Sequence, residues 1–207
     1  MRPVFLLLLG SIPVWAQPFT AGFKFGVPLT DLVNSAESGP FNYTSQTQRY
    51  VVGATAELRL PLSLAVEFDA LYRRLEYNGS GNLVDIATAS HTTGGAWEFP
   101  LLVKYRFHFP VVRPYVDGGV AWNTLTGLKQ TITQTGILGS GTTTGTPTEL
   151  QHSTTAGFVL GGGIDIHAVF LHISPELRFT RWNSAQFSNG SFHSNQNQAE
   201  LLVGFTF

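Results

Sequence analysis

The stretch LLVGFTF, residues 201–207, alternates its side chains as an extended strand does and ends on an aromatic ring. Four apolar residues fall on one side of such a strand: Leu201, Val203, Phe205 and Phe207. Chain ends usually fray into water, where an apolar stripe is unfavourable. The stretch therefore predicts a strand whose apolar side faces something other than water.

The composition is poor in charge without being rich in apolar residues. Charged residues make up 12% of the 207, roughly half of the ~25% usual in soluble domains, and hydrophobic residues make up 43%. The net charge of -1 argues against nucleic acid as a partner, because phosphate binding needs a basic face. The absence of cysteine excludes disulfides, thiolate metal sites and a cysteine nucleophile.

Residues 1–16 have the pattern of a secretory signal peptide. Arg2 supplies the positive start, a short apolar run spans 4–12, and Val14 and Ala16 fit the small-residue cleavage pattern. A membrane anchor is the alternative, but the run is shorter than the ~20 residues of a spanning helix, and Pro13 interrupts it. We therefore expect residues 17–207 to form the mature chain.

Beyond the signal, long segments alternate with period two, which is typical of strands. We expect eight strands, over 19–29, 49–60, 62–75, 96–109, 113–125, 154–167, 169–182 and 197–207. Short turns alternate with long polar links over 30–48, 76–95, 126–153 and 183–196. This alternation places every short turn, and both termini, at one end of an antiparallel up-and-down barrel. Ten strands would result if residues 129–135 extend or pair separately.

Eight such strands could form a soluble lipocalin-like barrel or a membrane barrel. The kinds of residue favour the membrane, because charge gathers on one strand face while the long links are nearly uncharged. The charged residues of that face are Lys24, Glu57, Arg59, Glu67, Asp69, Arg73, Glu98, Lys104, Arg106, Asp117, Asp165, Glu176, Arg178 and Glu200. Paired charges can be accommodated away from water. We therefore predict that they plug the lumen and that the apolar face contacts lipid.

Aromatic residues concentrate at the strand ends, as in the girdles that mark both membrane interfaces. The predicted girdles comprise Tyr50, Tyr72, Trp97 and Trp122 at the long-link end and Phe107, Phe109 and Phe207 at the short-turn end. Trp182 has the wrong parity for an outward residue, so either a bulge lies nearby or it points inward.

With these features the mature chain resembles the small eight-stranded outer-membrane β-barrels, the OmpA/OmpX-like porin-family proteins. The resemblance implies an integral protein of the outer membrane of a Gram-negative bacterium, in contact with lipid and with both termini in the periplasm. In that family the last strand is a signal for the barrel-assembly machinery. Its pattern is matched here by Leu201, Val203, Phe205 and Phe207.

One stretch, LHISPELRF, resembles the His-x-Ser arrangement of outer-membrane lipid A deacylases. His172, Ser174 and Glu176 share a strand face, and a serine nucleophile needs a histidine base within reach. That face is the charged, lumenal one, away from lipid, so we predict no catalytic residue. His167 and His172 flank a turn without a third ligand in a recognisable spacing, so we expect no metal and no cofactor.

The sequence thus predicts a non-enzymatic outer-membrane barrel with a structural or surface-interaction role. An eight-stranded interior is just wide enough for side chains to fill. Its long polar links could contact an unknown extracellular ligand. Two alternatives remain open: a narrow porin that passes ions or small solutes, and a lipid A hydrolase that uses His172 and Ser174.

Overall fold

The computed structural model describes most of the chain beyond the first 18 residues. The described ranges are 19–31, 37–38, 41–45, 49–83, 86–109, 112–136, 139–147, 150–168, 171–189 and 192–207. The predicted signal peptide lies outside them. No helix within these ranges is long and apolar enough to span a membrane.

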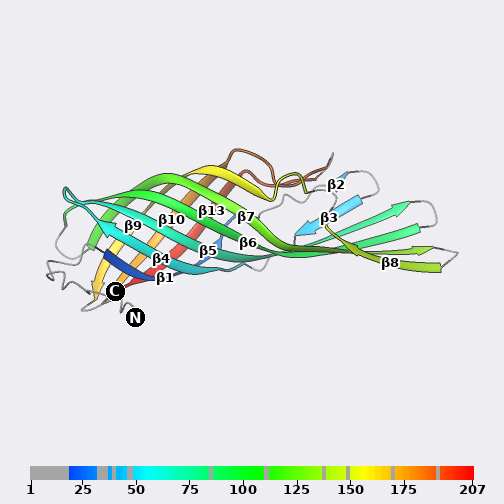
Figure 1. Ribbon diagram of the computed structural model, residues 1–207, viewed down its shortest axis with the longest axis horizontal. Coiled ribbons are helices and arrows are strands. Elements are labelled where there is room, and N and C mark those ends of the chain that lie inside the picture. The colour runs from blue at the N-terminus through cyan, green and yellow to red at the C-terminus, as the bar shows by residue number, and fades with distance from the viewer. Residues whose placement is uncertain are drawn as a thin grey trace, which may run out of the picture.

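Eight antiparallel strands form a closed ring, which confirms the predicted barrel (Figure 1). The ring strands are β1 (Phe19–Pro28), β4 (Val51–Arg59), β5 (Leu64–Leu83), β6 (Ile86–Arg106), β7 (Val112–Gly136), β9 (Thr154–Ala168), β10 (Leu171–Trp182) and β13 (Asn197–Thr206). Each pairs with its neighbours along the chain, and β1 pairs with β13 to close the ring. In this closing pair Phe25 lies opposite Val203, so residues 201–206 form one side of the seam that closes the barrel.

The two ends of the ring differ greatly. At one end short turns join β4 to β5, β6 to β7 and β9 to β10, and the start of β1 and the end of β13 lie at this end (Figure 1). We call it the short-turn end. At the other end β5, β6 and β7 continue well past the remaining strands, and we call this the extended end.

The predicted long links over 76–95 and 126–153 are mostly strand in the structure, so the predicted strands were too short there. Residues 76–95 continue β5 and β6 as one paired hairpin, with Tyr77 opposite Thr92. Residues 129–135 extend β7 and pair with both β6 and an added strand, β8 (Gly139–Gly145). Neither face of this extension is apolar, so period-two hydrophobicity could not reveal it, although β-branched Thr favours strands.

Short strands also form in the other two links. β2 (Glu37–Ser38) pairs with β3 (Phe41–Ser45), and β3 adds to the extension of β5. β11 (Ser188–Asn189) and β12 (Phe192–His193) pair with each other near the extended end. The ring itself keeps eight members.

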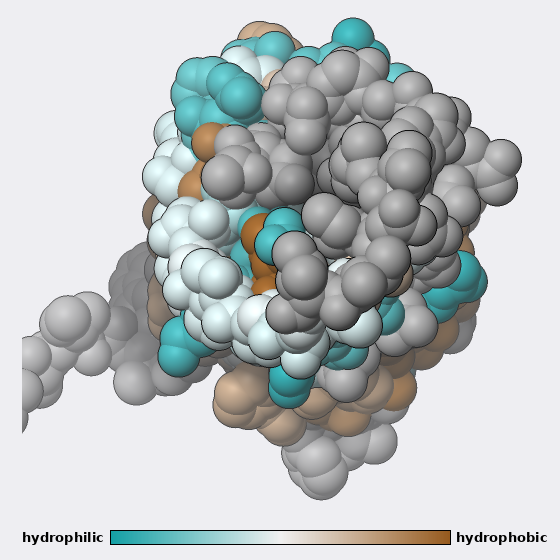
Figure 2. All heavy atoms as spheres, turned by 90° about the vertical axis from the view of Figure 1, so that its right-hand side faces the viewer, coloured by the Kyte–Doolittle hydropathy of each residue, from teal (hydrophilic) through white to brown (hydrophobic). Residues whose placement is uncertain are grey.

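The barrel is apolar outside and polar inside. Large apolar side chains with exposed surface recur around the wall: Phe23, Phe25, Phe68, Leu101, Val103, Val116, Phe158, Leu160, Leu177, Phe179 and Leu201. Alternate positions on the same strands are buried and largely charged. Figure 2 views the extended end, where the described surface is mostly white to teal. A water-soluble barrel has the opposite polarity, so the arrangement is that of a membrane barrel.

Candidate functional site

The centre of the lumen holds one buried lysine among three carboxylates. Lys24 points inward from β1, and its Nζ lies 2.5 Å from Glu67 Oε1, 3.1 Å from Asp69 Oδ2 and 2.9 Å from Glu176 Oε2. All four side chains are buried. These carboxylates come from β5 and β10, so Lys24 joins elements from different parts of the ring.

Two further cations complete this central layer. Arg178, which is fully buried, donates from Nε to Glu176 at 2.7 Å and from Nη2 to Asp69 at 2.9 Å. Lys104 donates to Glu67 Oε2 at 2.6 Å and lies 4.1 Å above the centre of the Tyr115 ring. Three cations and three carboxylates therefore share one continuous network.

Smaller groups of charges lie on either side of the central layer. Toward the extended end, Arg73 contacts Glu200 at 3.5 Å and donates to Gln198 at 2.7 Å. Toward the short-turn end, Arg106 donates from Nε to Asp165 and from Nη2 to Glu57. The lumen is thus crossed by charged layers along its length.

Four predicted network residues have buried carboxylate oxygens without a hydrogen-bond partner among the described residues. Asp117 lacks a partner at both oxygens, and single oxygens lack one in Asp69 (Oδ1), Glu98 (Oε1) and Glu200 (Oε2). Arg59 differs in another way, because its side chain is partly exposed at the rim of the short-turn end. The predicted charges are therefore closely paired at the centre of the lumen and less completely paired toward its two ends.

An apolar plug fills the lumen at the extended end, and it was not predicted. We define it by its buried residues Leu75, Tyr77, Ala96, Leu125 and Phe187. The rings of Tyr77 and Phe187 meet edge to face with centroids 5.8 Å apart. Leu75 and Tyr77 share the parity of inward-facing Arg73, so the alternation could have indicated their direction.

Phe187 comes from the polar link after β10, where no periodicity marks it. Its position is fixed by its neighbours: Gln186 donates from Nε2 to Asn123 Oδ1 at 3.0 Å, and Ser194 Oγ accepts from the Gln186 backbone N–H at 2.8 Å. The link therefore folds back into the lumen at the extended end.

The His-x-Ser stretch does not form a nucleophile–base pair. Ser174 donates to Asp165, whereas Glu176 is held by Lys24 and Arg178. His172 Nδ1 accepts from Arg59 Nη2 at 2.8 Å, and its Nε2 lies 2.6 Å from Nε2 of His167. The histidine and serine thus have separate partners, and the relay that activates a serine is not assembled. Within the described residues no three potential metal ligands come together.

The predicted girdle residues lie near the ends of the barrel wall with exposed or half-exposed rings. They are Tyr50, Tyr72, Trp97 and Trp122 toward the extended end and Phe107, Phe109 and Phe207 at the short-turn end. Phe207 is 69% exposed. Trp182 is only 3% exposed and points inward, where it packs with Leu102, Ala121 and Val159. Its parity thus indicated its direction without any bulge.

Comparison with known proteins agrees with this architecture. The family described as outer membrane protein beta-barrel domain matches residues 15–181. The solved structure of OprG from Pseudomonas aeruginosa aligns with a TM-score of 0.51 at 12% identity, covering 91% of this chain and 92% of that one. Neisserial surface protein A aligns with a TM-score of 0.44 at 12% identity, covering 91% and 94%.

A comparison with curated proteins gives no match. The family match spans far more than half of the sequence and agrees with the ring of eight strands, the lipid-compatible wall and the charged interior. This chain therefore belongs to the outer membrane protein beta-barrel domain family, and it is a protein of the bacterial outer membrane.

Proposed function

We propose that this protein is a non-enzymatic barrel with a closed lumen whose extended strands serve as an interaction surface outside the cell. In this arrangement the short-turn end and both termini face the periplasm. The observation that carries the proposal is the combination of the buried ion-pair network and the apolar plug along a single lumen.

The network opposes ion passage because its charges hold one another. Lys24 and Arg178 each contact more than one carboxylate, at distances from 2.5 to 3.4 Å. A passing ion would have to separate buried pairs, and breaking one such pair costs about 3–5 kcal/mol. The apolar plug then presents an unfavourable second barrier to a hydrated ion.

The extension offers a broad polar surface. β8 has every residue exposed and contains only Gly, Ser and Thr, and among the described strands it pairs with β7 alone. An edge of this kind leaves backbone N–H and C=O groups available to another chain.

Planar-bilayer conductance of the refolded chain tests the closed lumen. We expect no reproducible current steps from protein whose folding is shown by its shifted mobility on unheated gels. Steps that change with Arg106→Ala or Glu98→Ala would instead establish a narrow porin. The enzymatic alternative is tested separately, by comparing lipid A mass in cells that carry wild type or Ser174→Ala. We expect identical masses.

A further inference from the structure

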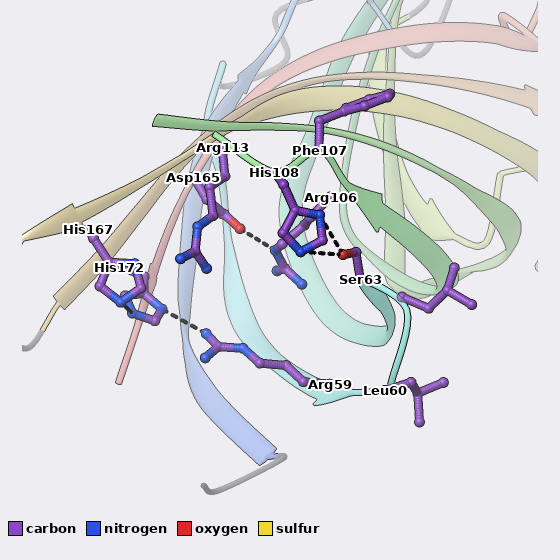
Figure 3. Close-up of a pocket in the computed structure, with 11 residues that line it drawn as sticks. Arg59, Leu60, Ser63, Arg106, Phe107, His108, Arg113, Asp165, His167 and His172 are labelled. Carbon is purple, nitrogen blue, oxygen red and sulfur yellow. Dashed lines mark hydrogen bonds and ion pairs between the residues drawn. The ribbon is translucent and has the colours of Figure 1, made fainter. Parts of the chain in front are cut away.

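A cavity at the short-turn end is lined by an excess of cationic side chains. It has a volume of about 150 Å³, roughly ten times the ~10–15 Å³ that one water needs. Arg59, Arg106 and Arg113 line it, together with three histidines, and Asp165 is the one carboxylate among its described lining residues. Figure 3 shows the three guanidinium groups directed into the same space, with His167 and His172 beside it.

The available carboxylates do not neutralise all three arginines. Asp165 lies opposite Arg113 in the register of β7 and β9. However, one oxygen of Asp165 accepts from Arg106 and the other accepts from Ser174. Glu57, just inside the cavity, is contacted by Arg106, Arg59 and Lys104. The side chain of Arg113, by contrast, has no hydrogen bond or ion pair with any residue that the structure describes.

The histidine pair adds donors of fixed direction. Because His172 Nδ1 accepts from Arg59, the neutral ring carries its proton on Nε2 and donates it to His167 Nε2. His167 then keeps its own N–H on Nδ1. The pair therefore contributes a hydrogen-bond donor and no negative charge.

We propose that this cavity binds a phosphate group, with Arg113 as its principal ligand and Arg59 beside it. Arginine forks suit phosphate because they donate two parallel hydrogen bonds to its oxygens. Donors that converge from several strands match the tetrahedral arrangement of those oxygens better than the flat carboxylate. The site lies at the opposite end from the interaction surface proposed above, so the two proposals stand or fall separately.

Calorimetric titration with inorganic phosphate tests the site on the refolded chain in a sugar-headgroup detergent, which contains no phosphate. We expect saturable binding that Arg113→Ala weakens about ten- to a hundred-fold, as the loss of a hydrogen bond to a charged group implies. Arg181→Ala is the matched control. It removes the same charge at the extended end, where Arg181 donates to Asn197 at 2.6 Å, and should leave binding unchanged.

Adding phosphatidylglycerol to the detergent distinguishes the two sources of phosphate. If a lipid headgroup occupies the cavity, the lipid lowers the apparent affinity of wild type for inorganic phosphate but not that of Arg113→Ala. If a soluble phosphate is the ligand, the affinity is the same with and without the lipid. Absence of saturable binding, or equal affinities for wild type, Arg113→Ala and Arg181→Ala, would overturn the proposal. Mobility on unheated gels verifies that both variants are folded.

Discussion

Arg178, like Lys24, is a buried cation at the centre of the lumen that contacts more than one carboxylate. It is fully buried and donates to both Glu176 and Asp69. Arg178→Met would remove a positive partner from these buried carboxylates, and loss of one partner from a buried pair costs about 3–5 kcal/mol. We expect the free energy of unfolding to fall by about that amount, measured by urea titration of tryptophan fluorescence in detergent.

Asp117 should respond in the opposite direction, although it is also buried and charged. Neither of its oxygens has a hydrogen-bond partner among the described residues. An unpaired buried charge is unfavourable, and Asp117→Asn removes it with almost no change of shape. We expect the free energy of unfolding at pH 8 to rise by about 1 kcal/mol. A loss as large as that of Arg178→Met would show that Asp117 is an essential member of the network.

Gly22 permits close approach of the two strands that close the ring. A Cβ there would lie 1.9 Å from the carbonyl oxygen of Phe205 on β13, and backbone cannot yield easily at that seam. We expect Gly22→Ala to reduce sharply the folded fraction seen on unheated gels. Gly141→Ala in β8 is the control, because a Cβ there meets nothing within 4 Å. Equal folded fractions would contradict the steric argument.

At the scale of elements, the hairpin of β5 and β6 has two separable parts. The part within the barrel carries Glu67, Asp69 and Glu98, whereas the part beyond Tyr77 and Thr92 is mostly small or polar residues on both sides, with Leu83 opposite Ile86 at its tip. Tyr77 and Thr92 are opposite each other, so a two-residue turn can join them. We expect replacement of residues 78–91 by Asn-Gly to leave refolding and the urea midpoint nearly unchanged. A large loss of folded protein would mean that the extension is needed for closure.

The same division explains what the sequence could predict. Where one face meets lipid and the other is charged, as in β10, alternation indicated both the strand and the direction of its side chains. Where both faces are polar, as in β8, the pattern gave no period, and the extension became visible only through its pairing with neighbours. The cation-rich cavity was missed for another reason: Arg59, Arg113 and His172 are far apart in sequence and meet only because the short turns gather at one end.

For the whole molecule, folding of the barrel wall and recognition of the last strand during assembly place separate requirements on the sequence. Phe207 is 69% exposed, and its backbone N–H donates to Ala21 O at 3.1 Å. This hydrogen bond does not involve the phenylalanine side chain. We propose that the Phe207 side chain is recognised by the barrel-assembly machinery. Phe207→Ala should therefore lower the amount of barrel in the outer membrane of cells several-fold while refolding in detergent stays as efficient as for wild type. Equal amounts in cells would contradict this role.

The unequal lengths of the ring strands have a consequence for access. Residues 126–136 of β7 continue past the barrel, and at ~3.3 Å per residue they reach roughly 35 Å beyond it, whereas β1 and β13 stop near the rim. The described strands therefore form a tall side at β5, β6 and β7 and a low side at β1 and β13. With the extended end outside the cell, as proposed, the tall side stands clear of the headgroup layer, whereas the low side lies close to it and is harder for large molecules such as antibodies to reach. The membrane surface thus limits which part of this protein a large molecule can contact.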